Sequence, residues 1–218
     1  DWLKSIGIDL PSVGSFGGAS VKRIHRPVDA EGKTLSVGSY MIPILEKNCK
    51  ELGIQLLLNT KADSILTDDT GAAVGITATG EGGAKVTVNA GSVVLATGGF
   101  GANLEMVTEY KPELAGFATT NAPGAQGDGI AMAQAIGAAT VDMDQIQIHP
   151  TVEVETAALI TEGLRGDGAI LVNAEGKRFC DEVGTRDAVS AAEIAQTGSY
   201  GWLVVDQKMV GASSVIAG

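Results

Sequence analysis

Charged and titratable side chains gather in the last third of the sequence. They are His149 before a proline, Glu162 and Arg165 three residues apart, and Arg186 in the string Thr185-Arg186-Asp187. Two or three local positive groups can bind a small anion, and a bidentate arginine contact holds a carboxylate strongly. Each residue alone also fits a role without chemistry. His149 could be a satisfied core residue, Glu162 and Arg165 a weak surface ion pair, and Arg186 a helix-flanking charge.

A second candidate site is the apolar run that ends in Ala96-Thr97-Gly98-Gly99-Phe100. Ligands in open α/β sheets bind beyond the carboxyl ends of strands, where small residues let the backbone approach them closely. A strand followed by a plain glycine turn explains this motif equally well.

The third candidate is the glycine-rich loop from Thr120 and Asn121 to Gly127, Asp128 and Gly129. Its glycines would expose backbone N–H groups at a helix N-terminus, which is a natural seat for a phosphate or another anion. Asp128 could accept a hydrogen bond from a cofactor hydroxyl. The favoured interpretation is a helix N-cap, because Asp is a leading residue at that position.

Periodicity and turn residues predict the elements that position these motifs. Helices are expected at 37–52, 103–110, 126–138 and 188–196, and strands at 54–58, 64–66, 73–79, 84–88 and 92–97, with a hairpin of 169–173 and 177–179. Gly53 should end the first helix, and Pro43 is tolerable there only in the first turn. Asp187 should cap the last helix, and Gly198 should close it.

The composition fits an α/β protein, with 30 glycines, 44% hydrophobic residues and only 4% aromatic residues. A helix-and-sheet domain is expected to give way to a second lobe near 143–147. A net charge of −11 argues against nucleic-acid or anionic-membrane binding. Cys49 and Cys180 form no CxxC or CxxCH pattern, so they give no signal for a metal, cluster or haem site and are read as a reduced pair.

No apolar run is long enough for a membrane span, and the start of the sequence has no signal-peptide character. The compartment is left open between cytoplasm and cell envelope for a soluble protein. The absence of an initiator methionine suggests an excised or processed piece.

The conjunction of these strings resembles the flavoprotein subunit of soluble fumarate reductases and related flavin-dependent enoate reductases. The resemblance covers nearly the whole chain. It includes Gly17-Gly18-Ala19-Ser20, His25-Arg26-Pro27, the 96–100 strand end, the 121–129 loop and the string from His149 to Asp187.

This resemblance implies FAD as cofactor and a mixed α/β fold. Residues 1–143 would be the later part of a doubly wound FAD-binding domain, and 144–218 the first part of a clamp (capping) domain. The positions that match flavin-contacting segments are Ala96, Thr97, Gly98, Gly99, Thr120, Asn121, Gly127 and Asp128, with Ala62 on the adenine side.

It also implies a reaction, the reduction of fumarate or a similar enoate. Flavin would deliver hydride to one alkene carbon, and Arg186 would deliver a proton to the other. His149 and Thr161 match contacts to a small dicarboxylate substrate. Glu162 and Arg165 match the relay that returns a proton to Arg186.

The sequence departs from the family pattern in ways that leave other interpretations open. It has no GxGxxG and no CxxCH, and the C-terminal substrate-binding segment would lie after Gly218. The 218-residue chain alone is therefore expected to bind FAD weakly or not at all and to be inactive, and the electron donor is unspecified. An oxidising relative, such as succinate dehydrogenase or L-aspartate oxidase, is the second interpretation, and a non-catalytic domain is the third.

Overall fold

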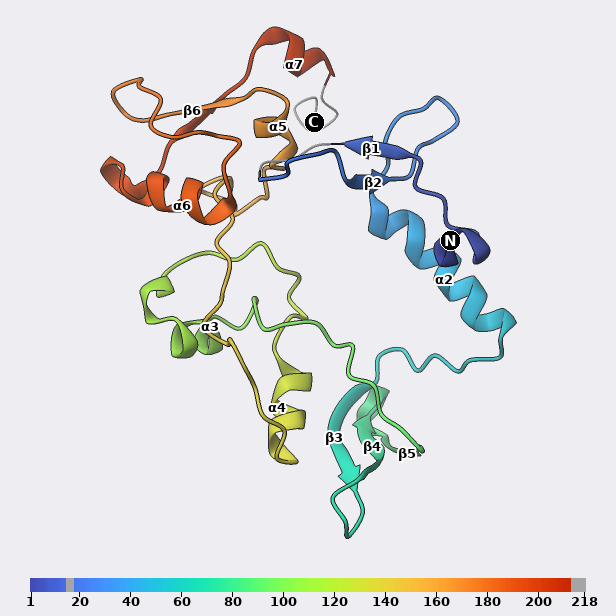
Figure 1. Ribbon diagram of the computed structural model, residues 1–218. Coiled ribbons are helices and arrows are strands. Elements are labelled where there is room, and N and C mark those ends of the chain that lie inside the picture. The colour runs from blue at the N-terminus through green and yellow to red at the C-terminus, as the bar shows by residue number, and fades with distance from the viewer. Residues whose placement is uncertain (15–17, 213–218) are drawn as a thin grey trace. The chain divides into compact units, whose positions relative to one another are not determined.

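The computed structural model describes residues 1–14 and 18–212, and the chain divides into two compact units. The first unit joins Asp1–Gln55 to the segment that starts at Gln147, and the second is Leu56–Ile146. Gly17 of the predicted Gly17–Ser20 motif and the predicted end near Gly218 lie outside the described residues. Both units mix helices with small antiparallel sheets, which agrees with the predicted mixed α/β class (Figure 1).

The first unit is built from short strands and helices around a small apolar core. Its elements are α1 (Trp2–Ser5), β1 (Ser12–Gly14), β2 (Ile24–Arg26), α2 (Val37–Glu51), α5 (Gly163–Gly166), β6 (Ile170–Val172), α6 (Arg186–Ile194), η3 (Thr197–Ser199), β7 (Trp202–Val204) and α7 (Gln207–Ala212). β1 pairs with β2, and β6 pairs with β7, both antiparallel. The core consists of Ile8, Leu164, Ala169, Leu171 and Val189.

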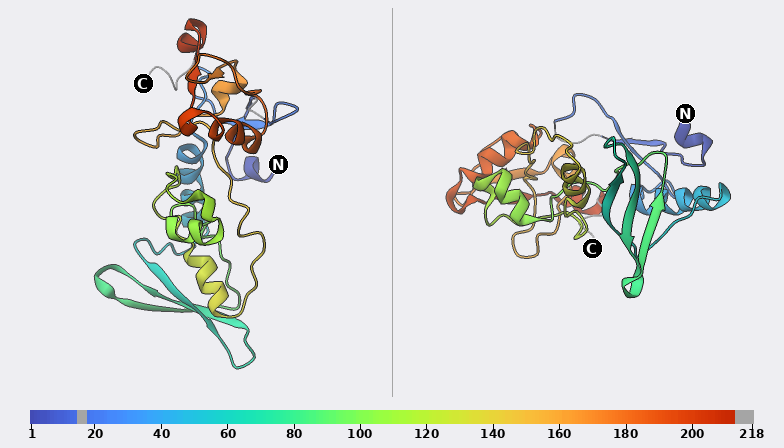
Figure 2. Two further views of the ribbon diagram at one scale, coloured as in Figure 1. Left: turned by 90° about the vertical axis from the view of Figure 1, so that its left-hand side faces the viewer. Right: turned by 90° about the horizontal axis from the view of Figure 1, so that it is seen from below.

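The second unit contains a three-stranded antiparallel meander and two helices. Its elements are β3 (Lys61–Thr67), β4 (Ala73–Thr79), η1 (Glu81–Gly83), β5 (Lys85–Asn89), α3 (Leu104–Tyr110), η2 (Pro112–Leu114) and α4 (Asp128–Ala135). The strand order is β3-β4-β5, and α4 packs against β3 (Figure 2). Ile65, Ala78, Val107, Leu114 and Met132 form its core.

Helix α2 confirms the predicted helix over 37–52 and its stop, because Gly53 has a positive φ of 69° and its N–H reaches the carbonyl of Lys50. The expectation for Pro43 is wrong, since this residue lies in the second turn of α2. A proline there removes one backbone hydrogen bond, and the remaining bonds of a 15-residue helix carry the turn.

The predicted strands at 54–58 and 92–97 are absent from the described part of the chain. Both runs have the apolar character of strands covered on two faces, but no described strand pairs with either of them. Their side chains are therefore exposed, with Leu58 at 77% and Val94 at 86%. A strand needs a hydrogen-bonding neighbour, and composition alone does not supply one.

The predicted hairpin after residue 169 is half correct. Strand β6 forms, and the turn closes through the N–H of Asn173 and the carbonyl of Lys177. The second arm is no strand, because it keeps a single bridge from Val172 to Arg178 before the chain turns away. The partner of β6 is instead β7, which the sequence pattern did not reveal.

Gly75 shows how tightly the meander is packed and provides a stability test. A Cβ at this position would collide with the carbonyl oxygen of Val88 and lie 3.1 Å from the Cα of Asn89. Because both obstacles are backbone atoms, we expect Gly75→Ala to destabilise the intact protein by roughly 1–3 kcal/mol in chemical denaturation. Gly91→Ala is the matched control, since a Cβ there meets nothing within 4 Å. Equal stability of the two variants would contradict this account of β4.

Candidate active site

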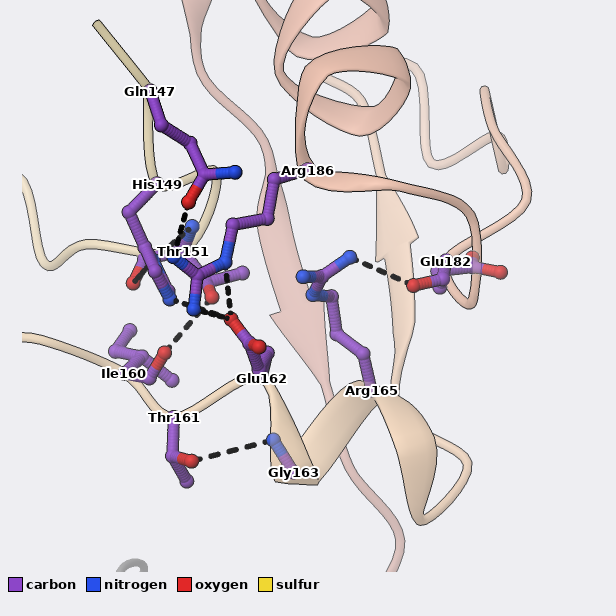
Figure 3. A network of polar contacts seen from close by, with 10 residues as sticks. All are labelled: Gln147, His149, Thr151, Ile160, Thr161, Glu162, Gly163, Arg165, Glu182 and Arg186. Atoms are coloured by element: carbon purple, nitrogen blue, oxygen red, sulfur yellow. Dashed lines mark hydrogen bonds and ion pairs between the residues drawn. The ribbon is translucent and has the colours of Figure 1, made fainter. Parts of the chain in front are cut away.

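A buried carboxylate, Glu162, lies at the centre of the candidate site (Figure 3). Its Oε2 accepts a hydrogen bond from Nε of Arg186 at 2.7 Å and forms an ion pair with Nη2 of the same guanidinium at 2.7 Å. The same oxygen lies 3.1 Å from Nε2 of His149. The structure therefore brings together three residues that are up to 37 positions apart in the sequence, counted from His149 to Arg186.

Short elements aim these side chains at one another. Glu162 is the N-cap residue of α5, and Arg186 is the first residue of α6. The predicted cap at Asp187 is wrong, because Thr185 is the N-cap and Asp187 lies in the first turn. Helix α6 also ends earlier than expected, at Ile194, so Gly198 does not close it. Threonine is also a favoured N-cap residue, so the local preference alone does not choose between the two positions.

His149 is held in one orientation by its neighbours. In the neutral tautomer with the proton on Nε2, this N–H donates to Glu162 and Nδ1 accepts the N–H of Thr151 at 3.2 Å; Nδ1 also lies 3.1 Å from the carbonyl oxygen of Thr151. Thr151 is itself buried, and its hydroxyl donates to the carbonyl of Ile160 at 2.8 Å. Burial, with a second contribution from the charge of Arg186, lowers the pKa of His149 below its ordinary value of 6.5, although Glu162 acts in the opposite direction. The imidazole is therefore neutral at physiological pH.

Arg165 lies deeper than the other charged groups, with 1% of its surface exposed. Its Nη1 donates to the carbonyl of Glu182 at 2.8 Å, and no described hydrogen bond joins it to Glu162. Burial lowers the pKa of Arg165, and Glu162 opposes this effect. Arg165 is thus close enough to Glu162 for their charges to interact, without a direct contact.

The predicted residue Thr161 and an unpredicted one, Gln147, complete the surroundings of this cluster. The Thr161 hydroxyl accepts the N–H of Gly163 at 3.3 Å. Gln147 accepts Nη1 of Arg186 through its Oε1 at 2.6 Å. A sequence signal for Gln147 existed, because it precedes His149 by two positions and such side chains share one side of an extended segment.

Gly18, in the Gly17-Gly18-Ala19-Ser20 segment that belongs to the family resemblance, contacts the chain just before Arg186. The N–H of Gly18 donates to the carbonyl of Val183 at 2.8 Å. A Cβ on Gly18 would lie 3.5 Å from the Cα of Thr185, so the two segments pack backbone to backbone. His25 is exposed on β2, and the described contacts do not bring it into the cluster.

In the second unit, the predicted cofactor segments, 96–100 and 120–129, and the residues next to them lie side by side. The N–H of Gly127 donates to the carbonyl of Gly99 at 3.2 Å, and the hydroxyl of Thr119 donates to the carbonyl of Gly101 at 2.6 Å. A Cβ on Gly129 would collide with the Thr97 hydroxyl. Only glycine therefore permits α4 to approach Thr97 this closely.

The backbone around these contacts is bare. A Cβ built on Gly98 or Gly99 would meet nothing within 4 Å, and Ala96, Thr120 and Asn121 are exposed. The N-cap of α4 is Gly127, with no side chain capping the helix. The favoured interpretation of Asp128 as the cap is therefore wrong, because Asp128 is the first residue of the helix. Its Oδ1 lies 3.5 Å from Nζ of Lys61. Uncapped N–H groups beside exposed glycine backbone suit a polar phosphate-bearing ligand.

A pocket of about 580 Å³ opens between β3 and α4. Ala62 and Asp128, both predicted cofactor residues, line it together with Lys61 and Met132. Its size falls within the range of small-molecule sites. The structure thus places the predicted adenine-side residue and the predicted loop residue on one cavity.

The family model described as FAD binding domain matches residues 1–212. The chain belongs to this FAD-binding family. The match confirms the resemblance on which the flavin assignment depends.

Two curated relatives carry fumarate reductase names. The chain is 46% identical over 209 residues to a fumarate reductase (cytochrome) of Shewanella frigidimarina, covering 96% of this chain and 36% of that protein. It is 46% identical over 207 residues to the NADH:fumarate oxidoreductase of Klebsiella pneumoniae, covering 95% of this chain and 22% of that protein. This chain thus spans about a third or less of the length of these relatives.

A solved structure supports the same relationship. The open conformation of a flavocytochrome c3 fumarate reductase matches with a TM-score of 0.78 and 38% identity, over 99% of this chain and 38% of that one. In the described residues, no helix is both long and apolar enough to cross a membrane.

The lowered pKa of His149 predicts how stability depends on pH. Because its folded-state pKa lies below the unfolded value of 6.5, the unfolded chain takes up the proton first on acidification. The stabilisation is fully present above about pH 6.5 and is lost as the pH falls toward the lower folded-state pKa. In denaturation curves of the intact protein from pH 8 to pH 5, His149→Gln should lose less stability on acidification than the unsubstituted protein.

The control for that experiment is His25→Gln, which removes the other histidine, exposed on β2. It measures what the loss of any histidine does to the curve. If His149→Gln and the unsubstituted protein lose equal stability between pH 8 and pH 5, the buried neutral imidazole is disproved.

Proposed function

We propose that this protein is an FAD-dependent oxidoreductase acting on CH–CH groups, which reduces the C=C bond of fumarate or a similar enoate. The observation that carries the proposal is the cluster in which Arg186 and His149 share one oxygen of buried Glu162. The fumarate reductase names of the relatives support this choice of substrate.

The glycine-lined segments of the second unit fit the cofactor. Ala96, Thr97, Gly98 and Gly99, with Thr120, Asn121, Gly127 and Asp128, would hold FAD through bare backbone and the uncapped start of α4, and Ala62 would lie on the adenine side. FAD, when bound, supplies a hydride for one alkene carbon. Residues 1–143 would form the later part of the FAD-binding domain and 144–218 the first part of the clamp domain.

The first unit would bind and protonate a small dicarboxylate. His149 and Thr161 would contact a substrate carboxylate, His149 as a neutral ring and Thr161 through its hydroxyl. Arg186 would donate a proton to the second alkene carbon, while its planar guanidinium polarises the substrate by hydrogen bonding. A carbanion-like centre is basic enough to take a proton even from arginine, which otherwise stays protonated.

The proton lost by Arg186 would be replaced through Glu162. That carboxylate already contacts Nε and Nη2 of Arg186 at 2.7 Å, so transfer needs no large movement. Arg165 would in turn donate a proton to Glu162. Its pKa is lowered, mainly by burial, which makes it a better proton donor than a solvated arginine. This last step requires Arg165 and Glu162 to come into contact during the cycle. The electron donor that reduces FAD stays unspecified.

Arg186→Ala and Arg186→Lys test the central assignment in the intact protein. We expect both to lower fumarate reduction by a reduced artificial dye on the order of 10³-fold or more, because the proton donor and its planar contact are lost. FAD absorbance should remain stoichiometric. Lys47→Ala, which removes an exposed cation of α2, should keep full activity.

Near-normal turnover in either Arg186 variant would refute the assignment. The same preparations should be assayed for succinate oxidation with an artificial acceptor. A faster oxidation than reduction in the unsubstituted protein would favour an oxidising relative instead.

Gly129→Ala tests the cofactor site separately from the chemistry. The added methyl group would push α4 away from Thr97, so we expect FAD affinity in the intact protein to fall at least about tenfold in a fluorescence titration. Gly91→Ala is the control, and its affinity should not change. Tight FAD binding by Gly129→Ala would place the cofactor elsewhere. The same titration on the 218-residue chain tests the expectation of weak or absent binding.

A further inference from the structure

One described hydrogen bond holds the guanidinium of Arg165. Its guanidinium is almost fully buried, yet Nε has no hydrogen-bond partner in the described structure. The hydrogen bond that fixes the group is the one from Nη1 to the backbone carbonyl of Glu182, at 2.8 Å (Figure 3). Any shift of that carbonyl would move the guanidinium, because an arginine side chain has many rotatable bonds.

Glu182 is anchored far more firmly than its place in a loop suggests. Its side chain is buried, with 4% of the residue exposed. Oε1 accepts the N–H of Leu171 in β6 at 2.9 Å and Nε of Arg178 at 3.1 Å. Oε2 accepts a hydrogen bond from Nη2 of Arg178 at 2.6 Å, so the guanidinium of Arg178 binds the carboxylate of Glu182 in a bidentate contact.

This carboxyl group is ionised at neutral pH. Burial acts to raise the pKa of Glu182, but the hydrogen bonds from Arg178 and from the N–H of Leu171 outweigh it and leave the pKa below its usual value. The contact with Arg178 is therefore an ion pair, and it ties residue 182 to the sheet through the neighbouring bond to β6.

The chain from Glu182 to Arg186 is short and constrained. The N–H of Gly184 donates to the carbonyl of Asp181 at 3.0 Å, and Gly18 donates to the carbonyl of Val183. Thr185 follows as the N-cap of α6, and Arg186 is the next residue. A movement of Glu182 would thus reach Arg165 through its carbonyl and Arg186 through three intervening residues.

We infer that Glu182 is a positioning residue, which sets the places of Arg165 and Arg186 on either side of Glu162. The inference rests on the proposed function, since it concerns the supply of protons in that reaction. Proton transfer depends steeply on the distance between donor and acceptor, so a displacement of about 1 Å at either arginine slows the reaction by up to about 10²-fold. Glu182 itself touches neither substrate nor cofactor in this scheme.

The test compares Glu182→Gln, Arg178→Met and the unsubstituted intact protein. In Glu182→Gln the amide oxygen can still accept the N–H of Leu171, but the charge that holds Arg178 is gone. We expect kcat for fumarate reduction to fall about tenfold or more, KM to change less than twofold, and the solvent deuterium isotope effect on kcat to rise. Arg178→Met, which alters an exposed side chain, should show the same changes to a smaller degree.

Asn173→Ala is the matched control for a loss of stability alone. Asn173 accepts the N–H groups of Glu175 and Lys177 in the turn after β6, and its described contacts do not include Arg165 or Glu182. Its melting temperature should fall while kcat and the isotope effect stay unchanged. If kcat in Glu182→Gln merely follows its melting temperature as in Asn173→Ala, Glu182 is a structural residue and the inference is wrong.

A crystal structure of the Glu182→Gln protein separates this inference from the proposed function, because it requires no turnover. We expect the Arg165 guanidinium to be displaced or its contact with the carbonyl of residue 182 to be broken. An unmoved Arg165 and Arg186 would overturn the inference, whatever the activity. If both are displaced but the unsubstituted protein does not reduce fumarate, the positioning role stands and the proposed function fails.

Discussion

The buried carboxylate of Glu162 is the constraint on which the candidate site depends. A charge removed from water is costly unless cations and hydrogen bonds replace its solvent. Arg186 supplies one hydrogen bond from Nε and an ion pair through Nη2, and the neutral ring of His149 supplies a second hydrogen bond, all to one oxygen. Removing either partner would leave a desolvated charge, so the three side chains hold one another in place. The same geometry holds the guanidinium of Arg186, the first residue of α6, in contact with a carboxylate.

Glu182 is a second buried carboxylate whose charge is balanced by an arginine and by hydrogen bonds. Glu182 is held by exposed Arg178 and by the backbone of β6, and its carbonyl in turn holds Arg165. The two glutamates therefore differ in what they do with their charge. Glu162 uses it to bind the residues that would take part in chemistry, whereas Glu182 uses it to fix the backbone that carries them. Burial of Arg165 between these networks is what lowers its pKa, which a surface arginine would not experience.

The second unit leaves backbone atoms open around the segments proposed to hold the cofactor. Gly98 and Gly99 leave open space where other residues would place a Cβ, while Gly129 lets α4 pack against Thr97. The absence of a side-chain cap on α4 leaves its first N–H groups available for a phosphate. Glycine is thus used in two opposite ways in one site, once to keep space open and once to let two segments close together.

The amino-acid sequence by itself determined the local elements and the identity of the chemical groups. Helix α2 with its stop at Gly53, strand β4 and helix α3 follow from periodicity and turn residues that act over a few positions. His149, Glu162 and Arg186 were recognisable from their order along the chain. The family resemblance then assigned them to one site.

Only the tertiary structure decided what depends on partners far away in the sequence. The runs at 54–58 and 92–97 carry strand composition but pair with no described strand, so most of their large apolar side chains stay exposed. Glu162 and Gln147 both contact Arg186, although they lie 24 and 39 positions before it in the sequence. The support that Glu182 gives to Arg165 spans 17 positions. Hydrogen bonds and ion pairs of this kind join residues that are close in space but far apart in the sequence. The pattern of residue types along one sequence does not contain the distances between such residues.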